Sequence, residues 1–356
     1  MLLLVLFILV FISFLEIKVK KVYYSFYFII ICLILIDSAK LASGTDYYYY
    51  FNDYHNYLEN INYESRYELI YSQLSKICSV SRVPYHLFLF GFYTLYYFLI
   101  GFTIKRYSPY PILSVLLFFC ITIGLLGSNR HLMAMAIVFF ATCKFVEIKQ
   151  NYKYLYFLLA LIIASGFHYS AFLAFPIIVF NRNITERNWF TILIISILLL
   201  VFNFNNTIVF KIDKYLPEVY SDLINKYRKT TDVVVPISYS LFLGVIRRGF
   251  LVLLFVIYKE KLQCLHFYRI LYNISWFSLI FYVFLFTMPF LGSRAGIYFL
   301  IFECISYAMI IKLINYQKLR LFILFLILIF GVFLFFKNIS IYPHLFIPYK
   351  TIFGVF

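Results

Sequence analysis

The chain has 356 residues, of which 64% are hydrophobic and only 13% are charged. A soluble domain carries about 25% charged residues, so this chain has too few of them to cover a globular core with a water-facing surface. Its formal net charge of +16 is scattered over short connections rather than gathered on one face, so we expect no nucleic-acid partner.

Apolar segments recur from one end of the chain to the other. They lie near residues 2–15, 22–37, 85–104, 110–127, 130–147, 153–166, 168–181, 189–206, 237–258, 268–290, 295–313 and 319–336. The first lacks the basic leader and cleavage site of a secretory signal, so we interpret it as a span. At about 20 residues per crossing, the sequence predicts an all-α polytopic membrane protein with about twelve transmembrane helices, ten being the lower bound, in one domain over residues 1–356. The sixth and seventh segments are short, and one of them is a candidate for a re-entrant or kinked element.

The connections between these segments alternate in character. One set is short and basic, as at Lys105 and Arg106, whereas the other is either very short or long and carries most of the acidic residues. Because basic connections stay in the cytoplasm, we expect both termini to lie outside.

Two long loops, about 38–84 and 207–236, are then external, and both are expected to contain amphipathic helices. In the first, apolar side chains recur at helical spacing and predict a helix that covers the bundle. They are Tyr67, Ile70, Tyr71, Leu74, Ile77 and Cys78. In the second, we expect a helix between Pro217 and Thr230.

The first loop begins with GTDYYYYFNDYHNY. Asp46 is the external carboxylate best placed to act as a base, although an Asx-turn or a helix N-cap after Gly44 would also explain it. The run from Tyr47 to Tyr50 offers aromatic faces to sugar rings, or it forms an ordinary interfacial belt.

Three further candidates stand where predicted helices begin at the outer side, namely Arg130, His168 and Arg294. Arg130 opens the fifth segment and His168 the seventh, where Tyr169 follows it. An arginine at a helix N-terminus opposes the helix dipole, so we expect an anion to compensate it, and phosphate oxygens suit such a position. His131 follows Arg130 directly and is expected to point to a different face.

Arg247 and Arg248 lie near the middle of the ninth segment, ISYSLFLGVIRRGFLVLLFVIY, where cations are costly unless they face a polar cavity or an anion. Arg294 opens the eleventh segment, and Glu303 follows at a similar depth to this arginine pair. One interpretation is an ion pair between Glu303 and Arg247 or Arg248, which leaves Arg130 and Arg294 unpaired. We favour the other, a basic cavity open to the outside and lined by the four arginines, with Glu303 orienting one of them.

Four motifs together resemble a known family. GTDYYYYF, SNRHLMAMA, GFHYSAFLAFP and SRAGIYF follow one another in the order seen in the EpsG/Wzy group of polysaccharide repeat-unit polymerases. Two positions depart from the pattern of that group. It often has Arg-Gln where this chain has Arg130 and His131, and an arginine ahead of the GTD element where this chain has Lys40.

The resemblance implies a metal- and cofactor-independent glycosyltransferase that joins oligosaccharide units carried on polyprenyl pyrophosphate. The reaction would take place at the outer face of the bacterial cytoplasmic membrane and extend O-antigen, capsule or exopolysaccharide. Its partners would be the lipid-linked oligosaccharide, membrane lipid, a chain-length regulator and a flippase. The expected roles are diphosphate binding by Arg130, Arg247, Arg248 and Arg294, catalysis by Asp46 or His168 with Arg130, sugar binding by Tyr47 and Tyr169, and support by Glu303 and His131.

Two other classes remain open from the sequence. A flippase for lipid-linked oligosaccharides, or another transporter of anionic cargo, would also need a basic cavity and many spans. The absence of duplicated halves in the sequence, the large unequal loops and the outward position of the cations disfavour it. A membrane acyl- or glycosyltransferase with a different acceptor is the third class.

Overall fold

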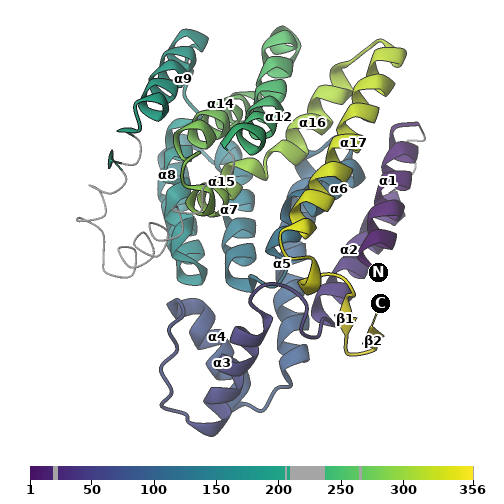
Figure 1. Ribbon diagram of the computed structural model, residues 1–356, viewed down its shortest axis with the longest axis vertical. Coiled ribbons are helices and arrows are strands. Elements are labelled where there is room, and N and C mark those ends of the chain that lie inside the picture. Colours follow the sequence, from purple (N-terminus) through teal and green to yellow (C-terminus); the bar gives the residue numbers. More distant parts are fainter. Residues whose placement is uncertain (19–22, 205–206, 209–236, 264–266, 356) are drawn as a thin grey trace. The chain divides into compact units, whose positions relative to one another are not determined.

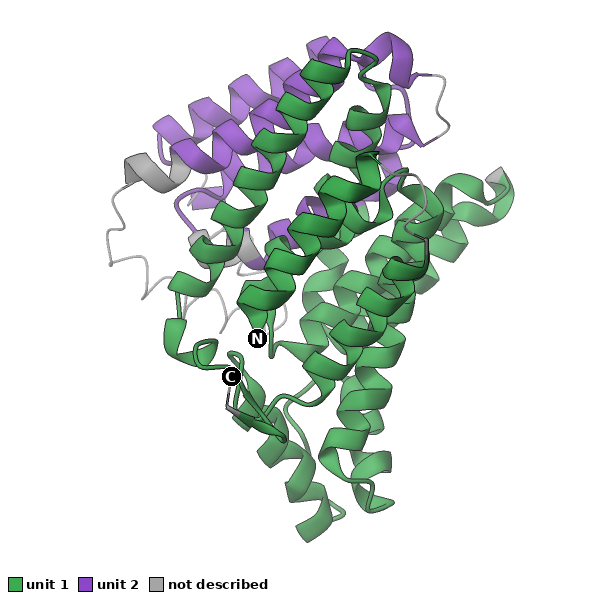
Figure 2. Cartoon of the chain, turned by 90° about the vertical axis from the view of Figure 1, so that its right-hand side faces the viewer, with its two compact units in different colours: residues 1–175, 303–356 green, residues 176–302 purple. Residues whose placement is uncertain are grey.

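The computed structural model describes the whole chain except residues 19–22, 205–206, 209–236, 264–266 and 356 (Figure 1). The predicted helix of the second long loop lies outside the described residues. By its internal contacts the chain divides into unit 1, residues 1–175 and 303–356, and unit 2, residues 176–302 (Figure 2). The prediction of a single domain stays a prediction.

Helices make up most of both units. Unit 1 contains α1 (Leu2–Lys18), α2 (Tyr23–Ser38), α3 (Tyr47–Glu59), α4 (Leu69–Val80), α5 (Tyr85–Tyr107), α6 (Pro111–Thr122), η1 (Ile123–Leu125), α7 (Asn129–Glu147), α8 (Gln150–Phe167), α16 (Glu303–Leu313), α17 (Gln317–Ser340), η3 (Pro343–Leu345), β1 (Lys350–Thr351) and β2 (Gly354–Val355). Unit 2 contains α9 (Glu186–Val201), α12 (Ile237–Ile257), α13 (Lys259–Leu262), α14 (Tyr268–Phe284) and α15 (Pro289–Leu300), and η2 (Tyr169–Val179) runs from the first unit into the second.

In the described part of the chain, three stretches are long and apolar enough to cross a membrane, namely Tyr85–Tyr107, Arg294–Leu313 and Gln317–Ser340. Shorter apolar helices accompany them at Tyr24–Ser38, Pro111–Leu125, Asn151–Phe167 and Tyr169–Val179. These apolar helices confirm the prediction of an all-α membrane protein. The number of crossings and their direction stay predictions.

Helix α6 lies at the core of unit 1, where it packs against α1, α5, α16 and α17. Its residues from Ile112 to Thr122 are buried, as expected for a helix that is apolar all round. At its start, the backbone N–H groups of Ile112 and Leu113 donate to the carboxylate of Glu16 on α1, over 3.0 to 3.1 Å. A negative side chain at the positive end of a helix satisfies N–H groups that have no partner within the helix. This contact anchors the core helix to α1.

Helices α3 and α4 form from the first long loop and pack against each other in unit 1. The buried side of α4 differs from the predicted one. Ser72, Ser75 and Ser79 are buried, whereas Leu74 and Ile77 are 38% and 62% exposed. Small side chains let α4 approach its neighbours closely, and their hydroxyls bond to carbonyls, as Ser79 Oγ does to the Tyr54 carbonyl over 2.5 Å.

Two predicted spans have a different local structure. The seventh segment is the 3₁₀-helix η2, which contains Pro176 and spans only Tyr169–Val179. The eleventh is interrupted by a turn at Ile301 and Phe302, so that α15 ends at Leu300 and α16 starts at Glu303. Glu303 therefore begins a helix rather than lying in the middle of one.

Unit 2 is built around α14, which contacts α9, α12 and α15. One buried amide connects its parts. Asn273 on α14 accepts a hydrogen bond from Trp189 Nε1 over 3.0 Å and donates to the carbonyls of Phe180 and Arg182 over 2.7 and 2.9 Å. These bonds fix the start of α9 and the preceding chain on α14.

Candidate functional site

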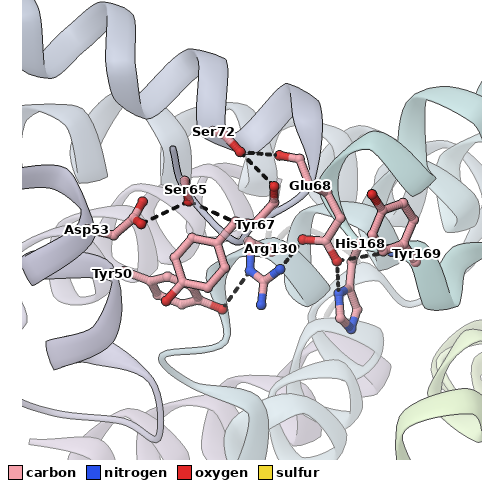
Figure 3. A network of polar contacts seen from close by, with 9 residues as sticks. All are labelled: Tyr50, Asp53, Ser65, Tyr67, Glu68, Ser72, Arg130, His168 and Tyr169. Carbon is pink, nitrogen blue, oxygen red and sulfur yellow. Dashed lines mark hydrogen bonds and ion pairs between the residues drawn. The ribbon is translucent and has the colours of Figure 1, made fainter. Parts of the chain in front are cut away.

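Three segments of unit 1 that are far apart in the sequence meet in one polar cluster (Figure 3). They are the stretch that ends at Glu68 before α4, the first turn of α7 with Arg130, and the junction of α8 with η2 at His168. His168 is able to turn into the cluster because it leaves the helix, with extended backbone angles of φ −157° and ψ 119°.

Glu68 is the centre of this cluster, and its side chain is only 4% exposed. One carboxylate oxygen, Oε2, accepts a hydrogen bond from Arg130 Nη1. The other, Oε1, is 2.8 Å from His168 Nδ1 and accepts the backbone N–H of Tyr169 over 3.3 Å. One buried carboxylate thus connects α7 to the start of η2, and its lone pairs are satisfied by three donors.

The electrostatics of the cluster favour an ionised Glu68. Burial by itself raises the pKa of this carboxyl group, but the hydrogen bond with His168 and the positive charge of Arg130 outweigh burial and lower the pKa below its usual value. An ionised carboxylate accepts hydrogen bonds and donates none.

Arg130 is held by aromatic as well as acidic groups. Its Nε donates to the Tyr50 hydroxyl over 3.2 Å, and its guanidinium carbon lies 4.2 Å from the centre of the Tyr67 ring. Among the described residues, its hydrogen bonds to Tyr50 and Glu68 use two of the five N–H donors of a guanidinium. The side chain is 17% exposed, so part of it is open to solvent.

The expectation that Arg130 is unpaired is wrong. An anion does compensate the cation at the start of α7, but it is the carboxylate of Glu68, 62 residues earlier in the chain. Glu68 was not recognised in the sequence because it is one of two glutamates in YESRYE, a stretch that resembles an ordinary polar loop. Only the packing of α4 against α8 brings it to α7.

His131 does not point away from the cluster either. Its ring lies 4.8 Å from the ring of His168, measured between centroids, and it is buried. Successive residues on a helix diverge by about 100°. Arg130 and His131 therefore point in different directions and contact different members of the cluster, Glu68 and His168.

Asp46 stands at the N-cap position of α3, although its side chain makes no capping bond there. Its Oδ2 instead accepts a hydrogen bond from Ser128 Oγ, the residue before α7, over 2.6 Å. The two backbones approach closely because Gly44 and Gly127 have φ angles of +95° and +102°, and a Cβ on Gly44 would lie 2.2 Å from the Leu126 carbonyl oxygen. This contact places the GTD element next to the first turn of α7.

Lys40 lies in the interior and supports the same turn. Its ammonium group donates to the Tyr93 hydroxyl and, over 3.1 Å, to Asn129 Oδ1. The Tyr93 hydroxyl also donates to Asn129 Oδ1, over 2.6 Å. Because Lys40 is fully buried, we assign it to the positioning of Asn129 and the adjacent Arg130 rather than to contact with a substrate.

The two predicted sugar-binding tyrosines lie in different surroundings. Tyr47 is only 2% exposed and packs against Phe51 and Tyr85. Tyr169 is 42% exposed, directly after His168. Of the tyrosine run, Tyr48 and Tyr49 are the members that are exposed, at 62% and 61%.

The other three arginines predicted to bind diphosphate, Arg247, Arg248 and Arg294, belong to unit 2. Arg248 is buried on α12, where it donates to Ser278 Oγ and to the Gly244 carbonyl and lies over the Tyr282 ring at 4.0 Å. Arg247 on the same helix is partly exposed, and Arg294 on α15 is exposed.

Glu303 is buried at the start of α16. This residue belongs to unit 1, as Arg130 does. A cavity shared by all four arginines, and an ion pair of Glu303 with one of them, both stay predictions. Among the described residues, no group of three or more His, Cys, Asp and Glu side chains is arranged to hold a metal ion.

The comparison with known families confirms the resemblance to the EpsG family. The sequence model of the EpsG family matches residues 26–351, nearly the whole chain. A search among curated proteins and among solved structures found no match. The apolar helices described above are those of a membrane protein. The chain therefore belongs to the EpsG family and is a membrane protein of polysaccharide synthesis.

Proposed function

We propose that this protein polymerises oligosaccharide repeat units that are carried on polyprenyl pyrophosphate, at the outer face of the bacterial cytoplasmic membrane. The observation that carries the proposal is the cluster of Arg130, Glu68 and His168. It combines a guanidinium that has donors to spare for a phosphate with an imidazole that is able to accept a proton. Membership of the EpsG family supports polysaccharide as the product class.

The reaction that fits this cluster is glycosyl transfer from a lipid diphosphate. A hydroxyl oxygen of the acceptor unit forms a bond to the anomeric carbon of the donor chain. The bond from this carbon to the phosphate oxygen breaks, and its electron pair leaves with the polyprenyl diphosphate. Arg130 would stabilise the charge that develops on the leaving group, and a base would take the hydroxyl proton.

The position of the cluster supports the outer face. It lies at the N-terminal end of α7, whereas Lys144 stands in the last turn of the same helix. A helix of 19 residues is about 28 Å long, so the two ends lie near opposite sides of a bilayer core if α7 crosses it. By the positive-inside rule, the end with Lys144 and the nearby Arg106 is the one expected in the cytoplasm, which supports an outward position of the cluster.

Reconstitution tests the proposal. The purified full-length protein is placed in liposomes with purified lipid-linked repeat units and no nucleotide, and the products are sized. A ladder of chains longer than one repeat unit is the expected result. Unchanged single units, even when they cross to the other leaflet, would contradict a polymerase and indicate a flippase instead.

A variant pair tests the site in cells. Arg130→Ala at normal membrane abundance is expected to leave single repeat units on the cell surface. The matched control is Arg106→Ala, which also removes an arginine from a glutamate pair, but an exposed one. Long polymer from the Arg130→Ala strain would refute the assignment of Arg130.

A further inference from the structure

Glu68 has a position that the reaction outlined above does not yet explain. It is buried, its partners hold its pKa below the usual value and so favour the carboxylate, and one of its oxygens lies 2.8 Å from His168 Nδ1. Since a carboxylate without a proton cannot donate, the hydrogen of this bond must belong to Nδ1. In neutral His168, the lone pair is then on Nε2, the nitrogen that points away from Glu68.

We propose that Glu68 is a positioning residue that makes His168 Nε2 the general base for the acceptor hydroxyl. This inference rests on the proposed polymerase function. The acceptor O–H bond breaks, its proton moves to Nε2, and the oxygen forms the new bond to the anomeric carbon while the lipid diphosphate departs. The carboxylate of Glu68 stabilises the imidazolium that results.

The geometry also explains why the base and the cation act together. Arg130 and His168 bind the two oxygens of one carboxylate, so their side chains lie next to each other (Figure 3). Arg130 and the Tyr169 N–H keep the carboxylate from rotating, which fixes the direction of the imidazole. A lipid diphosphate on Arg130 would therefore have its reacting sugar close to Nε2.

The other candidate base, Asp46, is less suitably placed to accept a proton. Asp46 has Oδ2 on the Ser128 hydroxyl, in the contact that holds the GTD element against α7. Its bonds thus tie two backbone segments together. His168 has a partner that sets its tautomer and an 18% exposed side chain that an acceptor hydroxyl is able to reach.

The tautomer is tested directly by nitrogen NMR. The full chain, labelled with ¹⁵N-histidine, is recorded in lipid at a pH where His168 is neutral, and its signal is identified by its loss in His168→Gln. The expected shifts are those of a protonated Nδ1 and an unprotonated Nε2. In Glu68→Gln, whose amide is able to donate to Nδ1, the other tautomer is expected to gain population. A wild-type His168 that carries its proton on Nε2 would overturn the inference.

Kinetics test the role of the base. With reconstituted protein, Glu68→Gln is expected to lower kcat about 10- to 100-fold, as is typical when the partner of a functional histidine is removed. The acid limb of the pH–rate profile should move to lower pH, because the imidazolium loses its negative neighbour. Glu68→Asp, which keeps the charge, should restore the position of this limb, whereas a purely structural role would leave the limb in place.

Among the described residues, the carboxylate of Glu68 lies 2.8 Å from His168 Nδ1, and the ring of His131 on α7 lies beside the His168 ring. Arg130, also on α7, contacts the same carboxylate of Glu68. His131→Gln removes the second imidazole, so an acid limb that persists in it belongs to His168. Glu147→Gln, at the far end of α7, is the control for loss of an ion-paired carboxylate.

The experiments distinguish failure of the positioning role of Glu68 from failure of the proposed polymerase function. Wild-type rate and pH profile in Glu68→Gln, with polymer still formed, would overturn the inference and leave the polymerase function standing. No polymer from the wild type would overturn both.

Discussion

Helix α7 carries an arginine–glutamate pair at each of its ends, and the two pairs differ mainly in burial. Arg130 in its first turn pairs with Glu68, whose side chain is 4% exposed, and Glu147 in its last turn pairs with Arg106 over 2.8 Å. In the second pair the arginine side chain is 50% exposed and the glutamate 29%. In each case the residue on α7 has a charge that opposes the helix dipole.

The difference in burial decides which of the two pairs contributes more to stability. An exposed pair exchanges one hydrated state for another and contributes little. A buried pair is costly to form and still more costly to break, because the remaining charge has no water to replace its partner. We therefore expect changes at the Glu68 end of α7 to dominate both stability and activity.

The largest difference in stability between the two ends of α7 is expected when the carboxylate of the pair is removed. Glu68→Ala leaves Arg130 and His168 without their common acceptor, and the loss in unfolding free energy should be about 3–5 kcal/mol. Thermal unfolding of the purified protein in detergent measures it as a lower Tm. Glu147→Ala is the matched control, and equal Tm values for the two variants would refute the comparison.

A double-variant cycle measures the coupling free energy within each pair. Glu68→Gln combined with Arg130→Gln removes both charges, so the pair should cost less than the sum of the single variants, with a coupling of about 1–3 kcal/mol. The corresponding cycle at Glu147 and Arg106 should show no measurable coupling. Additive effects at the buried end would mean that Arg130 does not depend on Glu68.

The pH dependence follows from the direction of the Glu68 pKa shift. Since the pKa is lower in the folded protein than its usual value of 4.5, the contribution of Glu68 is fully present above about pH 4.5 and is lost as the pH falls through the folded value. The Tm difference between wild type and Glu68→Gln should shrink as the pH falls below 4.5. A difference that grows in that range would have the wrong sign.

The smallest expected effect is a difference in how salt changes the Tm penalties of the two pairs. Raising NaCl to about 1 M shortens the screening length to about 3 Å, which weakens the exposed pair of Arg106 and Glu147. The Tm penalty of Glu68→Ala should persist under these conditions, whereas any penalty of Glu147→Ala should vanish. Loss of both penalties would mean that water reaches the buried pair.

Some of the site was predictable from the sequence. Arg130 and His168 attracted attention because polar residues stand there at the entrance of apolar segments, where composition changes abruptly. Glu68 gave no such signal, since two glutamates in a tyrosine-rich loop are unremarkable by composition. The inward face of α4 also differs from the apolar face that the sequence predicts, because serines at close helix contacts are buried as well as larger apolar residues.

By itself, the sequence determined the membrane class, the approximate positions of the helices, the family and two members of the polar cluster. These properties depend on local hydrophobicity and on motifs that are continuous in the chain. The tertiary structure decided which carboxylate meets Arg130, that both histidines lie together, and that Tyr47 is buried. Most of these facts depend on contacts between segments that are far apart in the chain, by up to 100 residues, and the packing of the helices brings those segments together.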